Sequence, residues 1–381
     1  MDLQQNDHVN LFLAPMEGIT HGAFREKISS MGGVDFCVTE FMRVTQQIHP
    51  KKVFYRFCPE LKKYNFNKNN SLDSSDRLAT NPFDFLNFKQ GPLINKKTPI
   101  LIQFLGADSE LLLQNSLRAI ELGAKGIDLN FGCPAKVVNR HMGGAFLLQF
   151  PNLIGQITKF IRSRLPVDIK VSAKIRLGFN DTSLIKDITQ ALDESNIDWL
   201  TVHCRTKKNG YAPPAYWEYI PTMKQWTNIP IIANGDIFSV EDLLMCYKQT
   251  KCTSFMIGRG IIFNPFLFTE VRGFLNKFSL NENISLIPKE EYKIPLTPEL
   301  VLKTLVEYFI LSENEVNEYY ATAKVKGWLK TISIKNSHFK VFFNKMKVLK
   351  GSEFKKELFK EFYETNSKNN HLYERPLSIL C

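Results

Sequence analysis

Short apolar runs recur along the first two thirds of the chain, and segments with a helical spacing of apolar positions separate most of them. The runs are apolar at nearly every position, so each is predicted to be a strand that is buried on both faces. The eight expected strands cover residues 11–13, 36–39, 100–103, 126–129, 169–175, 200–203, 230–233 and 254–257. Helices are expected at 110–122, 153–164, 183–194 and 240–247.

This alternation of β and α units favours one fold class, a (β/α)8 TIM barrel, over residues 1–275. Closure into a barrel buries both faces of every strand, as the uniformly apolar runs require. An open, doubly wound parallel sheet is the alternative that the same pattern leaves.

Two polar segments interrupt the pattern. Residues 64–97 are rich in Asn, Ser, Asp and Lys, and we expect an inserted loop there. Residues 276–298 are polar and contain proline, which is typical of a linker. Beyond them the spacing predicts helices at 298–312, 315–333, 339–349 and 353–363. We therefore expect a small all-helical domain over residues 299–381.

The net charge of the chain bears on its binding partner. The 381 residues carry a net charge of +11, which favours an anionic partner without distinguishing RNA from DNA or a membrane surface. No run approaches the roughly 18 apolar residues of a membrane span, and the first residues lack a basic and apolar leader. The seven cysteines form no CxxC pair, which argues against structural zinc and disulfides. We expect a cytoplasmic protein with reduced thiols, no metal and no membrane association.

Polar residues stand at or just after most of the strand ends, where a barrel of this kind carries its active site. These residues are Glu17, Gln103, Asn130, Lys174, Arg176, His203, Arg205, Asn234, Asp236 and Arg259. Lys174 and Arg176 are two residues apart, as are His203 and Arg205, so each pair is expected to point to one side of its strand. Both pairs can then face one mouth of the barrel.

Glycines accompany the polar residues after the last two strands, in the sequences NGD at 234–236 and GRG at 258–260. Each sequence alone is typical of an ordinary turn. Their shared position is the usual phosphate site of this fold, where backbone N–H groups and an arginine bind an anion. We therefore expect a phosphate-bearing cofactor or substrate.

Cys133 follows Asn130 in a tight Gly-Cys-Pro turn. A lone cysteine is more often a small buried apolar residue. Its position directly after a strand end nevertheless favours a role in chemistry. A thiol with an ordinary pKa of about 8.5 is mostly protonated at neutral pH, so it can act as a general acid.

Several short motifs combine these residues: APMEG at 14–18, TEFMRV at 39–44, QFLGAD at 103–108, DLNFGCPAK at 128–136, AKIRLGF at 173–179, HCRT at 203–206, ANGDI at 233–237 and IGRG at 257–260. Together they resemble the tRNA-dihydrouridine synthases, flavoenzymes that reduce uridine in tRNA. The resemblance covers almost the whole chain. TEFMRV and the following KKVFYRFCPEL look most similar to the bacterial branch that acts on uridine 16 of the D-loop.

The resemblance implies an FMN cofactor, NADPH or NADH as electron donor, a tRNA substrate and, we expect, a monomer. Cys133 would be the proton donor, with Asn130 near the target base. The residues implied around the flavin are Pro15, Met16, Glu17, Gln103, Lys174 and His203, and those implied for its phosphate are Asn234, Gly235, Asp236, Gly258 and Arg259. The residues implied for tRNA are Arg43, Arg176, Arg205, Lys324, Lys326 and Lys347.

The predicted helical domain has a charge pattern that suits tRNA. Residues 319–352 contain eight lysines and no acidic residue. Solvated lysines around an aromatic core would have the same pattern, but the absence of acidic residues favours a contact with phosphates.

Two other functions are weighed against tRNA reduction. One is a small-molecule FMN oxidoreductase of the dihydroorotate dehydrogenase type, for which a basic helical domain has no purpose. The other is an RNA-binding barrel without catalysis, which the cysteine and the polar strand ends disfavour. We therefore predict an FMN-dependent reductase of the C5=C6 bond of a tRNA uridine.

Overall fold

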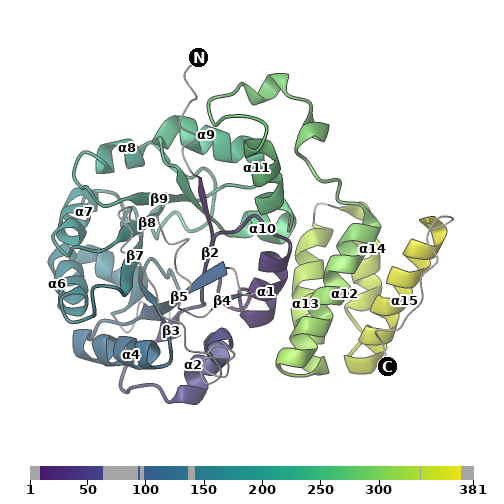
Figure 1. Cartoon of the computed structure of the whole chain (residues 1–381), viewed down its shortest axis with the longest axis horizontal. Coiled ribbons are helices and arrows are strands. Elements are labelled where there is room, and N and C mark those ends of the chain that lie inside the picture. The colour runs from purple at the N-terminus through teal and green to yellow at the C-terminus, as the bar shows by residue number, and fades with distance from the viewer. Residues whose placement is uncertain (1–8, 63–92, 95–97, 136–141, 335, 370–381) are drawn as a thin grey trace, which may run out of the picture. The chain divides into compact units, whose positions relative to one another are not determined.

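The computed structural model describes residues 9–62, 93–94, 98–135, 142–334 and 336–369 (Figure 1). The chain divides into two compact units, Met1–Lys293 and Ile294–Cys381, and each is described by itself. In the described part of the chain, no helix combines the length and the apolar character that crossing a membrane requires.

The first unit is a closed (β/α)8 TIM barrel, which confirms the predicted fold class. Its eight parallel strands are β1 (Asn10–Leu13), β2 (Phe36–Val38), β5 (Thr98–Leu105), β6 (Gly126–Phe131), β7 (Lys170–Arg176), β8 (Trp199–His203), β9 (Ile231–Asn234) and β10 (Ser254–Ile257). β2 pairs with both β1 and β5, so this ring of strands has no open edge. That closure excludes the open, doubly wound sheet.

Helices surround the strands (Figure 1). They are α1 (Gly22–Ser30), α2 (Lys51–Phe57), α4 (Ser109–Glu121), α6 (Pro151–Arg162), α7 (Ile185–Asp193), α8 (Tyr219–Met223), α9 (Val240–Thr250), α10 (Arg259–Phe263) and α11 (Leu267–Leu275), with the short 3₁₀-helix η2 (Gly144–Gln149). Local sequence sets several of their starts. Asp108 and Ser239 accept hydrogen bonds from the first turns of α4 and α9, because their side-chain oxygens satisfy otherwise unpaired N–H groups.

Large apolar side chains fill the inside of the barrel. Phe12 of β1 and Phe36 of β2 stack at 4.9 Å between ring centroids, and Trp199 of β8 packs against Phe12. Phe12, Phe36, Trp199 and Met256 belong to one buried cluster. The barrel therefore has a packed core, and a ligand site must lie at an end of the strands rather than along their axis.

The two predicted interruptions have different outcomes. Most of the expected insertion at 64–97 lies outside the described residues, apart from the short strand β4 (Leu93–Ile94), which pairs antiparallel with β5. The expected linker contains the 3₁₀-helices η3 (Ile284–Leu286) and η4 (Lys289–Glu291). Lys277 pairs with Glu291, and the Tyr292 hydroxyl donates to Glu241 of α9. Most of this segment therefore belongs to the barrel unit.

The described residues of the second unit form four helices: α12 (Pro298–Glu315), α13 (Glu318–Ser333), α14 (Ser337–Met346) and α15 (Gly351–Asn369). Thr297, Asn317 and Asn336 cap the first three through their side chains. Aromatic residues form the core. Tyr308 and Trp328 meet edge to face at 5.0 Å between centroids.

Candidate active site

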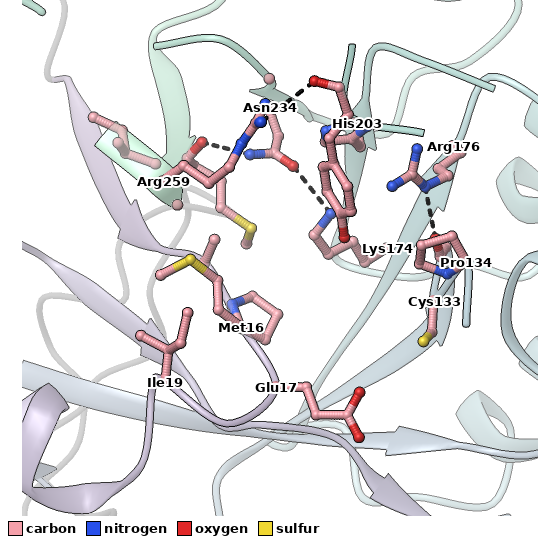
Figure 2. A pocket seen from close by; sticks show the side chains of 18 of the residues that line it. Met16, Glu17, Ile19, Cys133, Pro134, Lys174, Arg176, His203, Asn234 and Arg259 are labelled. Atoms are coloured by element: carbon pink, nitrogen blue, oxygen red, sulfur yellow. Dashed lines mark hydrogen bonds between the residues drawn. The ribbon is translucent and has the colours of Figure 1, made fainter. Parts of the chain in front are cut away.

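A cavity of about 710 Å³ lies at the carboxyl ends of the barrel strands, a volume within the range of small-molecule and cofactor sites. Its lining comes from the segments after β1, β2, β6, β8, β9 and β10, together with residues of β6 to β10 themselves (Figure 2). In this view Arg259 and Cys133 lie on opposite sides, with Lys174 and Asn234 between them. The strand ends thus bring together residues that are far apart in the sequence.

Glycine conformations shape the Arg259 side of the cavity. Gly235 has φ +124°, and a Cβ there would lie 2.9 Å from the Cβ of Ala215, so a side chain is excluded both by the backbone and by the neighbour. A Cβ on Gly260 would lie 2.2 Å from the carbonyl oxygen of Ile237. These turns therefore need glycine, as their place after β9 and β10 suggested.

The carboxylate of Asp236, a residue predicted at a phosphate, is occupied by partners within the protein. Its Oδ2 accepts from the backbone N–H of Ala215 at 2.8 Å and from the Arg205 guanidinium, and its Oδ1 accepts from Arg259 at 3.2 Å. Asp236 also has φ +50°. Its carboxylate holds the two arginines in place, which leaves its backbone, rather than its side chain, for contact with an anion.

Arg205 is fully buried and does not line the cavity. Its Nε donates to the carbonyl of Ala212 at 2.6 Å, and its Nη1 is buried without a hydrogen-bond partner. This placement does not fit the predicted contact with tRNA, because a phosphate of a large partner cannot reach a fully buried side chain. The expectation assumed that the strand geometry continues through Arg205, but β8 ends at His203, and the Arg205 N–H donates to the His203 carbonyl at 2.7 Å.

Lys174, His203 and Asn234 form the polar wall of the cavity. The Lys174 ammonium donates to Oδ1 of Asn234 at 3.0 Å, and Nδ2 of Asn234 donates to the Met256 carbonyl at 2.7 Å. Burial and the neighbouring Arg176 lower the pKa of Lys174 to about 8. Burial, followed by the charges of Arg176 and Lys174, lowers the pKa of His203 well below its ordinary value. The imidazole is therefore neutral at pH 7, and its buried Nδ1 has no partner.

Cys133 lies on the side of the cavity away from Arg259, beside Leu105, Phe41 and Ala135. Burial is the main cause that raises the pKa of its thiol above the ordinary value. Its backbone N–H donates to Oδ1 of Asn130 at 2.5 Å. Asn130 itself also lines the cavity.

Gln103 and Arg176 are more enclosed than expected. Gln103 is fully buried, does not line the cavity, and accepts from Asn130 through Oε1 at 2.8 Å. Arg176 does line the cavity, yet its Nε donates to the carbonyl of Gly132 at 2.8 Å and its Nη1 to that of Gly210 at 2.8 Å. Arg176 therefore holds the turn before Cys133 against the loop after β8.

Comparisons with known proteins decide the family. A family model described as dihydrouridine synthase (Dus) matches residues 12–362. The chain belongs to the dihydrouridine synthase family. A protein named tRNA-dihydrouridine(16) synthase from Neisseria meningitidis serogroup B is 33% identical over 366 residues, covering 95% of this chain and 98% of that protein. Proteins of the same name from Shewanella oneidensis and Cupriavidus necator are 39% and 42% identical, over 73% and 70% of this chain and 80% and 74% of theirs.

As a dihydrouridine synthase, the chain is an oxidoreductase, and several residues of its cavity were not predicted from the sequence. Tyr211 is half exposed, and its ring lies 5.0 Å from the Arg176 guanidinium and 5.1 Å from that of Arg259. Phe41 and Phe238 also line the cavity. Tyr211 stands in a loop without a strand pattern, so no periodic signal marked it. Phe41, by contrast, belongs to the quoted TEFMRV motif.

The predicted tRNA residues of this dihydrouridine synthase have different surroundings. Arg43 is half-buried in the short strand β3 (Met42–Arg43), outside the cavity lining, and it lowers the pKa of the nearby Cys133 thiol in part. Lys347 is exposed, and Lys324 is half-buried with its ammonium over the Tyr320 ring. The Lys326 ammonium donates to the carbonyls of Lys347 and Leu349, so it caps the C-terminal end of α14.

The charge of the helical unit is also less one-sided than the sequence indicated. Lys345 pairs with Glu357 of α15, which lies outside the lysine-rich segment. The inference that these lysines have no counter-charge is wrong for this residue, because a helix distant in sequence supplies one. Elsewhere, no group of three or more His, Cys, Asp or Glu among the described residues is placed to hold a metal ion.

Proposed function

We propose that this chain reduces the C5=C6 bond of uridine 16 in the D-loop of tRNA to dihydrouridine, using FMN and NADPH or NADH. The observation that carries the proposal is one cavity, in a barrel of the dihydrouridine synthase family, lined by a buried thiol on one side and by glycine turns with an arginine on the other. Position 16 is supported by the names of the relatives.

The donor set of the cavity fits FMN. The unpartnered Nδ1 of His203 and the ammonium of Lys174 can meet the polar edge of a flavin, with Pro15, Met16 and Glu17 beside the ring. Asn234, Gly235, Gly258, Arg259 and the backbone of Asp236 would hold the phosphate. A Cβ on Gly258 would lie 3.3 Å from the Cβ of Ala14 and 3.4 Å from the sulfur of Met16, so glycine leaves space for a ligand to approach the backbone there.

The chemistry divides between cofactor and protein. Bound FMN would supply hydride chemistry toward C6 of the uracil ring, with NADPH or NADH as the source of electrons. Cys133 gives the proton from its Sγ to C5. Burial raises the pKa of this thiol, which keeps it protonated at neutral pH and suits an acid rather than a nucleophile. Asn130 holds the backbone N–H of Cys133, and Arg176 holds the carbonyl of Gly132, so the turn that carries the thiol is fixed from both sides.

The target base must leave the stacked tRNA to enter the cavity, which costs a few kcal/mol. Contacts to phosphates offset this cost. We propose that Lys347 and Lys324 of the helical unit, with Arg43 of the barrel, make such contacts. We also propose that the enzyme acts as a monomer, and in the cytoplasm because its substrate is found there. The two alternative functions account for less of the structure. A small-molecule oxidoreductase of the dihydroorotate dehydrogenase type leaves these lysines without a role, and an RNA-binding protein without catalysis leaves the Cys133 thiol without one.

The proposal is tested with purified protein, unmodified tRNA, FMN and NADPH. We expect absorbance near 450 nm and dihydrouridine at position 16, mapped by mass spectrometry. Cys133→Ala is expected to keep the flavin and to lower turnover roughly 10²- to 10⁴-fold, the usual contribution of a general acid. Cys252→Ala is the matched control, because Cys252 is buried outside the cavity lining. A colourless protein after FMN addition, or full turnover by Cys133→Ala, contradicts the proposal.

A further inference from the structure

Asp128 is a fully buried carboxylate in β6 to which the mechanism above gives no task. Both of its oxygens accept hydrogen bonds. The Ser172 hydroxyl of β7 donates to Oδ1 at 2.5 Å, and Nε2 of Gln103 of β5 donates to Oδ2 at 2.6 Å. Asp128 therefore joins three neighbouring strands beneath the cavity.

The contacts continue from Asp128 to the thiol-bearing turn. Gln103 uses Nε2 for Asp128 and accepts from Nδ2 of Asn130 through Oε1 at 2.8 Å. Asn130 then accepts through Oδ1 from the N–H of Gly132 at 2.9 Å and from that of Cys133 at 2.5 Å. One chain of hydrogen bonds thus runs from the buried carboxylate to the backbone of Cys133.

The two ends of this chain determine its direction. Both oxygens of Asp128 accept, and with the carboxylate ionised they can only accept, so Gln103 presents its NH₂ group to Asp128 and its oxygen to Asn130. A backbone N–H only donates, so Asn130 must present its oxygen to the Cys133 turn and its NH₂ group to Gln103. Every amide then has one orientation in which all partners are satisfied, and a rotated amide would place two donors or two acceptors together.

A carboxylate is an expensive way to fill this space. Burial raises the pKa of Asp128, and the hydrogen bonds from Ser172 and Gln103 and the charge of Lys174 oppose that rise. A neutral side chain would avoid the desolvation of a charge. A neutral amide both donates and accepts hydrogen bonds, so it could pair with Gln103 in either orientation. An ionised carboxylate only accepts, and this fixes the orientation of the Gln103 amide.

We propose that Asp128 is a positioning residue for Cys133, acting through Gln103 and Asn130. The carboxylate sets the orientation of both amides, and Asn130 in turn holds the turn that points the thiol into the cavity. This inference rests on the proposed function in one respect, that Cys133 is the proton donor. Its experiment therefore includes a measurement on the thiol that does not depend on turnover.

The first test compares Asp128→Ala with Ser172→Ala. Both remove a buried polar group from the same contact, but only Asp128→Ala breaks the chain to Cys133. We expect Asp128→Ala to lower kcat on the order of 10- to 100-fold, the effect of a misplaced reacting group, with little change in the KM for tRNA. Ser172→Ala is expected to lower thermal stability while kcat stays near that of the wild type. The 450 nm absorbance reports the flavin content of each variant.

The second test exchanges the two polar groups. Gln103→Glu alone places two carboxylates at hydrogen-bond distance and is expected to lower kcat as Asp128→Ala does. In Gln103→Glu combined with Asp128→Asn, residue 103 accepts from both residue 128 and Asn130, so the orientation of Asn130 is restored. We expect the double variant to recover most of the lost kcat. A merely structural role predicts that thermal stability recovers in the double variant without a matching recovery of kcat and of the Cys133 alkylation rate, and this arm decides the question if Asp128→Ala does not fold.

The third measurement is the alkylation rate of Cys133 by iodoacetamide, read by peptide mass spectrometry. We expect it to be several times faster in Asp128→Ala and unchanged in Ser172→Ala, because only the former releases the turn. Equal rates in the two variants, or a double variant no better than Gln103→Glu, overturn the inference. If the wild type does not reduce tRNA, the proposed function fails, and the alkylation rates still decide the role of Asp128.

Discussion

Replacing Lys174 removes a charge that the protein holds inside the cavity. Burial and the nearby Arg176 guanidinium lower the pKa of Lys174 to about 8, whereas a lysine in the unfolded chain titrates near 10.4. The folded state therefore loses this proton first, and between these two values the unfolded state binds more protons. Because of this difference, the free energy of unfolding rises with pH across that window.

The size of the effect follows from the two pKa values. One pKa unit corresponds to about 1.4 kcal/mol, so the buried charge lowers the free energy of unfolding by up to about 3 kcal/mol below pH 8. This destabilisation is fully present at neutral pH and is lost above the unfolded pKa of about 10.4. Between pH 7 and pH 9.5 the wild type should gain about 2 kcal/mol from this residue.

The assay is urea unfolding of the FMN-free protein, with reductant present, at several pH values between 7 and 9.5. Tryptophan fluorescence reports mainly on the barrel, since Trp199, Trp217 and Trp226 lie there and Trp328 lies in the helical unit. Lys174→Met and Lys174→Arg are compared with the wild type. The first variant has no charge, and the second has one that does not titrate in this range. Neither variant should show the rise of about 2 kcal/mol in the free energy of unfolding between pH 7 and pH 9.5, because the side chain is uncharged throughout in Lys174→Met and charged throughout in Lys174→Arg.

Parallel curves for the wild type and both variants refute the reasoning. They would mean that water reaches the ammonium freely, or that other charges compensate for its burial. A rise that is lost in Lys174→Met but kept in Lys174→Arg would assign the titration to another group that responds to the size of the side chain. In the proposed complex the polar edge of the flavin accepts a hydrogen bond from the ammonium, which favours its charged form, so the same rise should shrink when FMN is added.

Three further predictions concern stability. Gly260→Ala should lower the free energy of unfolding by about 1–3 kcal/mol, because the added Cβ would meet a backbone carbonyl. Gly327→Ala is the control: its helix position has open space, so the substitution should raise the free energy of unfolding by about 0.5–1 kcal/mol. Both values are measured by urea unfolding. Arg25→Met should cost about 3–5 kcal/mol because it leaves Glu60 buried and unpaired, and adding Glu60→Leu should recover much of that; no recovery would contradict the argument. Lys326→Met should lower the thermal midpoint of the helical unit by removing donors from two carbonyls, and an unchanged midpoint would show that these contacts contribute nothing.

The barrel was predictable because its signal is local. A parallel strand that is covered on both faces is apolar along its whole length, and each of the eight runs became a strand of the ring. The short elements were not predictable in the same way. β3 contains two residues and η2 six, too few for a periodic pattern to appear.

The candidate site was predictable as a set of strand ends but not as a set of contacts. Cys133, Asn130, Lys174 and His203 line one cavity, as the barrel geometry implies. Arg205 was expected at the same mouth and is buried instead, since Asp236 and the carbonyl of Ala212 supply its partners. The strand pattern predicts the position of a residue at a strand end, but it does not predict the tertiary contacts of its side chain.

The sequence by itself determined the fold class, the end of the barrel that carries chemistry and the residue types gathered there, because burial periodicity and strand ends are encoded within short windows. The tertiary structure decided which polar groups face the cavity and which serve as internal partners. Gln103 and Asp128 are 25 residues apart, and Lys174 and Asn234 are 60 apart. Hydrogen-bond direction and desolvation depend on such distant neighbours, so only folding distinguishes the thiol at the cavity wall from the carboxylate that holds its turn.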